Sequence, residues 1–254
     1  MTARLQGKVA LVSGAGQGIG RGIARALAAE GADVCLAGRT LAKVEKVAAE
    51  IAESGGSALA VRCDVADRTQ VDVAVVTAVE RFGGLDVLVN NAQTTAPNRR
   101  LQDVPIEDVE VCWSTGPVGS LHAMQAAFPH LCERGGGSIV NLGSNTGVDG
   151  SPLFGPYAMA KEAIRGLTKV AAREWGRFGI RVNVICPFGD SPSAQEFQRD
   201  HPEAAAAILR STPLGRVGNC EADIGRAVVG LVSDDFSYLT GATLMLDGGL
   251  CILR

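Results

Sequence analysis

The feature that most restricts the fold is a glycine-rich stretch, Gly14 to Gly20, between an apolar run and a helical pattern. The apolar run, residues 8–13, is rich in β-branched side chains, as expected of a buried strand. The helical pattern ends at Gly31, and a second apolar run follows at residues 34–37. This order predicts a βαβ unit whose first turn lets the backbone approach a bound pyrophosphate.

Strands and helices continue to alternate along the chain. Further strands are predicted at residues 58–62, 85–89, 137–142, 180–185 and 243–246. Helices are predicted at about 40–53, 68–82, 106–132 and 221–233, and another helix, which contains residues 157–161, ends at about residue 178. The segment 187–217 is polar and contains several prolines, which predicts a mobile loop with one short helix. Such alternation is typical of a parallel sheet covered by helices on both faces. Since no linker or repeat interrupts it, we predict a single α/β domain over residues 1–254, with a doubly wound sheet of about seven strands.

Composition excludes several classes of function. The chain has 254 residues, of which 46% are hydrophobic and 20% charged, as is ordinary for a globular protein with a substantial core. The net charge of −3 gives no general attraction to nucleic acid or anionic membrane. No apolar run is long enough to span a membrane, and the N-terminus lacks a signal-peptide core. We therefore expect a cytoplasmic protein with neither nucleic acid nor membrane as a partner.

Cysteine and histidine give no sign of a metal site. The seven cysteines are scattered and odd in number, and no pair has the close spacing of zinc ligands. In a cytosolic protein such cysteines are expected to be reduced and buried. The three histidines do not cluster either, so we expect no metal.

The residues at the end of the second strand are expected to determine which cofactor the protein prefers. A carboxylate there would bind a ribose 2′-hydroxyl and favour NAD, whereas an arginine favours a 2′-phosphate. The sequence reads Gly38-Arg39-Thr40, without a carboxylate. Arg39 can stack on adenine and pair with phosphate, although it could also be a solvated surface residue. Gln17 adds no positive charge in the turn. Arg39 and the absence of a carboxylate nevertheless predict that the protein prefers NADP(H) to NAD(H).

A tyrosine and a lysine in a later helix are candidate catalytic residues. Tyr157 and Lys161 are four residues apart and so share one helix face, and Ser144 precedes them. A phenol keeps its proton until about pH 10, but a nearby ammonium lowers this pKa. Tyr157 is therefore a candidate general acid/base. Any amphipathic helix can produce the same spacing, so the rest of the chain must decide.

Together these features resemble the short-chain dehydrogenase/reductase family over essentially the whole chain, near its ketoacyl-reductase-like members. The matching segments are Ser13 to Gly20, Asp64-Val65, Asn90-Asn91-Ala92, Ser144, Tyr157 with Lys161, Tyr238 to Gly241, and Leu246 to Gly249. The resemblance implies a Rossmann fold, an NAD(P) cofactor, a small carbonyl or alcohol substrate and a homotetramer or dimer.

The resemblance also implies a role for each matching residue. Ser144 would orient and polarise the substrate carbonyl, Tyr157 would donate a proton to the developing alkoxide, and Lys161 would hold the nicotinamide ribose and lower the pKa of Tyr157. The residues implied to bind the cofactor are Ser13, Gly14, Gln17, Gly18, Ile19, Gly20, Arg39, Asp64, Val65, Asn91, Ala92, Tyr157, Lys161 and Pro187. A partly apolar substrate pocket is predicted around Gln93, Phe154 and Phe188.

Two departures from the family pattern concern polar side chains near the predicted site. Gln93 stands where the family usually has glycine, directly after Asn90-Asn91-Ala92. Gly116 stands where the family usually has an asparagine, at a site that holds a water linking the lysine to solvent. Pro117 follows it and removes a helical N–H, which predicts a kink that frees a carbonyl for the same water.

A third departure lies after the strand 180–185. Pro187-Phe188-Gly189 replaces the usual Pro-Gly, and Pro192 stands where the family has a threonine that contacts nicotinamide. Ser191 and Ser193 flank this position and could substitute for it.

The leading hypothesis is an NADP(H)-dependent oxidoreductase that interconverts a ketone or other carbonyl with a secondary alcohol, using Tyr157 as general acid/base. One alternative is an NAD(P)-binding protein with weak or no turnover, acting as a sensor or structural subunit, which Gly116 and the altered loop would favour. Another is a 3-ketoacyl-thioester reductase, whose basic patch for a carrier protein could include Arg99 and Arg100.

Overall fold

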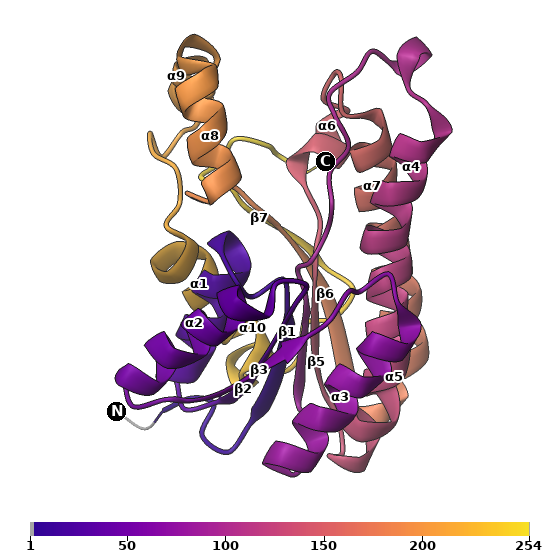
Figure 1. The fold of residues 1–254 in the computed structure, drawn as a ribbon, viewed down its shortest axis with the longest axis vertical. Helices are drawn as coiled ribbons and strands as arrows, with labels where there is room; N and C mark the ends of the chain where they lie inside the picture. The colour runs from indigo at the N-terminus through magenta and orange to yellow at the C-terminus, as the bar shows by residue number, and fades with distance from the viewer. Residues whose placement is uncertain (1–2, 254) are drawn as a thin grey trace.

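A parallel sheet forms the centre of the computed structural model, which describes residues 3–253 (Figure 1). Its strands are β1 (Val9–Ser13), β2 (Asp33–Gly38), β3 (Ser57–Arg62), β4 (Val87–Asn90), β5 (Gly137–Leu142), β6 (Ile180–Pro187) and β7 (Thr243–Leu246). Within the described residues the sheet has seven strands in the order β3-β2-β1-β4-β5-β6-β7, and every neighbouring pair is parallel. The predicted α/β class and doubly wound parallel sheet are therefore confirmed.

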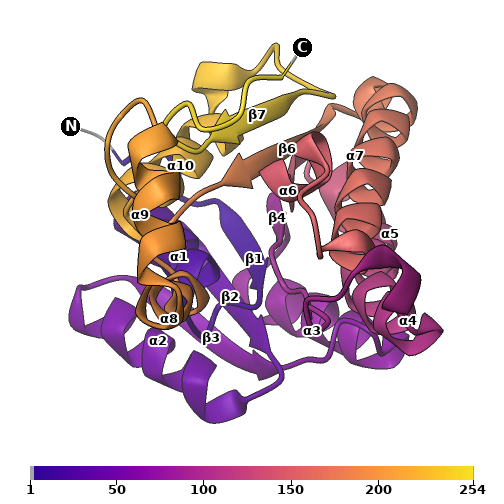
Figure 2. The same cartoon turned by 90° about the horizontal axis from the view of Figure 1, so that it is seen from above.

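Helices cover the two faces of the sheet (Figure 2). On one face lie α1 (Gly18–Ala29), α2 (Leu41–Glu53) and α10 (Arg226–Val232), and on the other α3 (Arg68–Phe82), α5 (Gly119–Glu133) and α7 (Gly155–Trp175). Successive strand side chains point to opposite faces, so Ala10 and Val12 join the first core while Val9 and Leu11 join the second. Both faces are buried, which explains why β1 is apolar without alternation.

The sheet has its crevice where the strand order reverses, between β1 and β4. β1 is followed by α1 on one face, whereas the chain after β4 passes to the opposite face. Connections that diverge in this way leave room for a ligand beyond the carboxyl ends of the strands. Since all strands are parallel, the segments that follow them meet at this one edge.

Three of the predicted segments are wrong in detail. The single helix expected at 106–132 is divided into α4 (Ile106–Trp113), a π-helical turn (Ser114–Val118) and α5. Pro117 has no N–H to donate, and the Gly119 N–H donates to the Ser114 carbonyl five residues earlier. The ladder of hydrogen bonds thus changes register at Gly116.

The segment 187–217 contains two helices instead of one. These are α8 (Pro192–Asp200) and α9 (Pro202–Ser211), which stand above the carboxyl edge of the sheet (Figure 1). Both begin with proline, whose fixed φ suits the first helical turn and whose missing N–H has no helical partner there. Prolines that suggested a loop therefore mark helix starts. The expected helix at 221–233 likewise begins with a π-helical turn, Cys220–Gly225.

Buried amides join the elements that end at the crevice. The Asn90 side chain on β4 donates to the Asn141 side chain on β5 at 2.8 Å, and Asn141 donates to the Thr168 hydroxyl on α7, also at 2.8 Å. All three side chains are buried. Polar groups removed from water this completely must be paired, so this chain of hydrogen bonds fixes β4, β5 and α7 relative to one another.

No helix among residues 3–253 is both long and apolar enough to cross a bilayer.

Replacing Asn141 with alanine should lower the free energy of unfolding by roughly 2–4 kcal/mol. The change leaves the Asn90 amide and the Thr168 hydroxyl without their partner inside the core. Ser138→Ala on the same strand is the matched control, because the buried Ser138 hydroxyl has no hydrogen-bond partner to lose. Urea denaturation of both variants measures the effect, and equal losses would contradict the assigned role of the Asn141 amide.

Candidate active site

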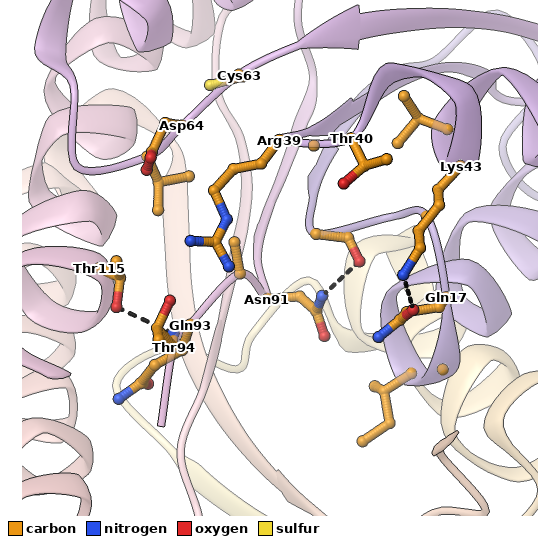
Figure 3. A pocket seen from close by; sticks show the side chains of 18 of the residues that line it. Gln17, Arg39, Thr40, Lys43, Cys63, Asp64, Asn91, Gln93, Thr94 and Thr115 are labelled. Atoms are coloured by element: carbon orange, nitrogen blue, oxygen red, sulfur yellow. Dashed lines mark hydrogen bonds between the residues drawn. The ribbon is translucent and has the colours of Figure 1, made fainter. Parts of the chain in front are cut away.

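A cavity of about 330 Å³ opens at the carboxyl ends of β1 to β4 (Figure 3). It is lined by the glycine-rich turn, by the residues that follow β2, β3 and β4, and by the start of α8. The lining residues predicted from the sequence to bind the cofactor are Gly14, Gln17, Gly18, Ile19, Arg39, Asp64, Val65, Asn91 and Ala92. Gln93, predicted to line the substrate pocket, also lines this cavity.

The close contact of the Asn91 side chain with the turn explains why the turn needs glycine. Its side-chain N–H groups donate to the carbonyls of Ser13 at 2.9 Å and Gly14 at 3.1 Å. A Cβ at Gly14 or Gly20 would lie 2.6 or 2.4 Å from the Asn91 nitrogen, and Gly14 also has a φ of +65°. These glycines therefore let the end of β4 close against the turn.

Ser13 and Gly20 support this closure and do not line the cavity. The Ser13 hydroxyl accepts the N–H groups of Asn91 at 3.0 Å and Ala92 at 3.1 Å. The loop after β4 is thus held by backbone as well as by side-chain hydrogen bonds. Ser13 thus positions residues that are predicted to bind the cofactor.

The first turn of α1 is available to an anion. Gln17 precedes the helix without a capping side-chain hydrogen bond, and the first turn contains no acidic residue. The N–H groups at such a helix start lack helical acceptors and carry partial positive charge. Gly18 and Ile19 line the cavity at this point, so the site fits a phosphate group.

Two cations stand at the end of the cavity beside β2. Arg39 lines it after β2, and Lys43 on α2 donates to the Gln17 side chain at 2.8 Å (Figure 3). Reading the turn alone missed Lys43, which lies four residues after Arg39 at the start of a helix. A Cβ at Gly16 would lie 2.9 Å from the Lys43 Cβ, so Gly16 permits α2 to approach. Among the described lining residues the only carboxylate is Asp64, which follows β3.

Lys161 lies buried at the carboxyl end of β5. Its ammonium donates to the Leu142 carbonyl at 2.7 Å, and the side chain is only 4% exposed. The same nitrogen lies 5.3 Å from the centre of the Tyr157 ring, one helical turn earlier. Ser144 follows β5, is buried, and caps the short helix α6 (Asn145–Asp149) by accepting the Thr146 N–H at 3.1 Å. The three predicted catalytic residues therefore gather at one strand end.

Burial is the main cause of the pKa shifts of Tyr157 and Lys161. It raises the pKa of Tyr157 to about 12, against a smaller opposite effect of hydrogen bonding to Ser144. It lowers the pKa of Lys161 to about 8. In this structure burial outweighs any effect of Lys161 on the pKa of Tyr157, because the Lys161 ammonium is directed at the Leu142 carbonyl. Tyr157 is consequently protonated at neutral pH, as a proton donor must be.

The remaining predicted residues lie around the site without lining the cavity. Pro187 ends β6, and the Phe188 N–H donates to the Leu246 carbonyl at 3.0 Å. Phe154 precedes α7 and is half-buried. In contrast, Ser191 and Ser193 line the cavity, with their hydroxyls 3.0 Å apart. Ser191 also caps α8, so the substituted loop is ordered over the glycine-rich turn.

A doubly wound parallel sheet with an uncapped helix start at its reversal point, and with Ser144, Tyr157 and Lys161 beyond β5, is typical of a dinucleotide-binding oxidoreductase. The family described as Enoyl-(Acyl carrier protein) reductase matches residues 14–251. A Clostridium protein named 12alpha-hydroxysteroid dehydrogenase is 39% identical over 251 residues, covering 96% of each chain. A 3-oxoacyl-[acyl-carrier-protein] reductase of Staphylococcus aureus is 38% identical over 247 residues, covering 96% of this chain and 98% of its own.

The fold is matched by a solved structure as well. A crystal structure titled as a putative short-chain alcohol dehydrogenase from Sinorhizobium meliloti has a TM-score of 0.92 and 36% identity, covering 98% of both chains. The protein belongs to the short-chain dehydrogenase/reductase family. It is an NAD(P)-dependent oxidoreductase that acts on CH–OH groups.

Lys161→Met should stabilise the fold at neutral pH by roughly 1–3 kcal/mol, because it removes a desolvated charge. Between pH 8 and 10.5 the unfolded chain holds the lysine proton while the folded protein releases it. Wild-type stability therefore gains from this group as the pH rises through that window, and the advantage of the variant should disappear by about pH 10.5.

Urea denaturation at pH 7.5, 9 and 10.5 would measure the difference between variant and wild type, in which effects of other titrating groups cancel. Lys169→Met is the matched control, since Lys169 lies exposed on the same helix. A difference that stays constant with pH would show that the Lys161 ammonium is not penalised by burial.

Proposed function

We propose that this protein is an NADP(H)-dependent oxidoreductase that interconverts a ketone and a secondary alcohol, with Tyr157 as general acid/base. The observation that carries the proposal is the buried Lys161 ammonium beneath Tyr157, with Ser144 at the end of the neighbouring strand. A buried charge is costly and is expected where chemistry requires it. The family of the chain supports the same reaction class.

Each of the three residues has a distinct task. The protonated Tyr157 hydroxyl donates its proton to the oxygen of a carbonyl as that oxygen becomes an alkoxide. The Ser144 hydroxyl orients and polarises the same carbonyl, and Lys161 supplies the positive charge that stabilises the phenolate left behind. The bound nicotinamide supplies or accepts the hydride. The site fits this cofactor because the uncapped start of α1 and the cavity together provide for its phosphates.

The preference for NADP(H) is supported by charge. Arg39 and Lys43 stand where a 2′-phosphate would lie, and no carboxylate follows β2 to bind a free 2′-hydroxyl. Gln17, which offered no charge itself, holds the Lys43 ammonium in place at 2.8 Å. The resemblance to a 3-oxoacyl-[acyl-carrier-protein] reductase is consistent with this preference.

Apolar side chains around the start of α7, the helix that carries Tyr157, favour a substrate with an apolar body. The Arg99 N–H donates to the Leu153 carbonyl at 3.1 Å, so the loops before α4 and α7 lie side by side. Leu101 and Leu153 are 76% and 46% exposed there, near the half-buried Phe154. Relatives named for hydroxysteroid and dichlorocyclohexadiene-diol oxidation act on ring alcohols, and we infer a substrate of comparable bulk.

We further propose that residues 1–254 act as one domain, in the cytoplasm, as a homotetramer or dimer. Exposed valines on α3 and α7 and the 42% exposed Trp113 support assembly, because such side chains are typically covered between subunits. The sequence pI of about 5.7 gives no reason to expect nucleic acid as a partner. Light scattering of the purified protein tests the assembly, which a monomer at micromolar concentration would contradict.

Tyr157→Phe should reduce the turnover of NADPH with ketones by at least roughly a hundredfold, because the proton donor is lost while the ring remains. Tyr238→Phe is the matched control, since it changes the other tyrosine of the chain, which is fully exposed. Steady-state oxidation of NADPH with cyclic and acyclic ketones is the measurement. Tight NADPH binding without turnover of any ketone would instead favour a cofactor-binding protein that is not an enzyme of this reaction.

Arg39→Ala and Lys43→Ala should each weaken NADPH binding by roughly tenfold or more, since each removes a charged partner of phosphate. NADH has no 2′-phosphate, so its affinity should change little. Isothermal titration of both cofactors, with Lys169→Ala as a remote control of equal charge change, measures the difference. If NADH affinity falls as much as NADPH affinity, these residues do not read the 2′-phosphate.

A further inference from the structure

Gln93 is half-buried, and both polar atoms of its side-chain amide are shielded from solvent without any hydrogen bond. Neither its Nε2 nor its Oε1 has a partner, and among the described residues no other side chain has two such atoms. A buried amide without partners destabilises a protein, and it usually indicates a group that is paired in another state of the molecule. Gln93 also lines the cavity, so a bound ligand is the natural source of a partner.

The amide rests against Gly116. A Cβ on Gly116 would lie 3.0 Å from both Cδ and Nε2 of Gln93, and 3.2 Å from Oε1. A side chain at position 116 would therefore push the amide away by a few tenths of an ångström or more. The π-helical turn around Gly116 therefore forms a resting place that gives Gln93 contact but no hydrogen bonds.

The backbone on both sides of Gln93 is held firmly. The Ala92 N–H donates to the Ser13 hydroxyl at 3.1 Å, and the Thr94 N–H donates to the Thr115 hydroxyl at 3.0 Å. Thr115 in turn donates to the Val111 carbonyl at 2.8 Å. Only the side chain of Gln93 can therefore change position readily, while its Cα stays beside the cavity.

The sheet order shows which part of the cofactor reaches Gln93. Arg39 follows β2, the phosphate-binding turn follows β1, Gln93 lies just beyond β4, and Ser144 follows β5. A dinucleotide stretched from Arg39 to the catalytic group must pass β4 after its phosphates. In the view of Figure 3, Gln93 and Lys43 accordingly lie on opposite sides of the cavity.

We propose that Gln93 is a specific binding residue for the nicotinamide half of the cofactor: its amide leaves Gly116 and pairs with the hydroxyl or carboxamide groups of that half. An amide offers one acceptor and two donors, which suits both kinds of group. The unpaired amide of the free protein then gains hydrogen bonds on binding, and this gain adds to cofactor affinity. The inference rests on the proposed function, since it requires a nicotinamide cofactor in this cavity.

The test compares two ligands by isothermal titration of the purified full-length protein. NADPH carries both halves of the cofactor, whereas adenosine 2′,5′-bisphosphate carries only the adenine half and its phosphates. Gln93→Leu should weaken NADPH binding roughly tenfold and leave the affinity for the fragment unchanged. Gln102→Leu makes the same chemical change at an exposed residue and should alter neither affinity.

Stability gives a second measurement that separates binding from folding. Gln93→Leu removes two unpaired polar atoms from a buried place, so the ligand-free variant should melt at the wild-type temperature or above it. Gly116→Ala should displace the amide from its resting place and leave NADPH affinity equal to or higher than wild type. A merely structural role for Gln93 would lower the melting temperature of the Leu variant and weaken both ligands together.

Failure of the proposed function and failure of the role of Gln93 would give different results. If the wild type binds NADPH no more tightly than the fragment and reduces no ketone, the proposed function is overturned and this inference falls with it. If the wild type is active but Gln93→Leu binds NADPH as tightly as wild type, only the role of Gln93 is overturned.

Discussion

The side-chain amide of Asn91 joins the two halves of the sheet at the place where the strand order reverses. It donates to the carbonyls of Ser13 and Gly14, and so closes the end of β4 against the turn after β1. This contact is possible only because Gly14 and Gly20 lack a Cβ. The glycine pattern of the turn is therefore a packing requirement as well as a phosphate-binding device. A cofactor can lie across the crevice only because its floor is held in this way.

The same principle positions the proposed catalytic group on the other side of β4. Asn90, directly before Asn91, is linked through Asn141 to Thr168 on α7, the helix that carries Tyr157 and Lys161. Paired polar groups thus fix the geometry below the site, where burial is complete. Nearer the cavity, by contrast, the buried polar groups of Lys161 and Gln93 have few or no hydrogen-bond partners. Stability is thus lost at the two residues to which we assign roles in chemistry and binding.

The sequence predicted the features that depend on short-range pattern. Apolar runs and helical spacing identified the strands and most helices, and motif spacing brought Ser144, Tyr157 and Lys161 together. The divided helix at Ser114–Val118 was not predicted, because the helical pattern of side chains continues through a change of hydrogen-bond register. Lys43 and the contact between Gln93 and Gly116 depend on how separate elements approach in space. The raised pKa of Tyr157 likewise follows from burial, which spacing along a helix does not determine.

Gln93 and Gly116 show how two departures from a family pattern can be one physical change. Gln93 adds an amide where the pattern has glycine, and Gly116 removes a side chain where it has asparagine. The amide now lies over the glycine, so close that a Cβ there would lie 3.0 Å from its Cδ and Nε2. Restoring either position alone would disturb the other, because one side chain fills the space between the loop after β4 and the π-helical turn. A polar group is thereby kept beside the crevice, carried by a loop whose backbone is held by hydrogen bonds while the side-chain amide makes none.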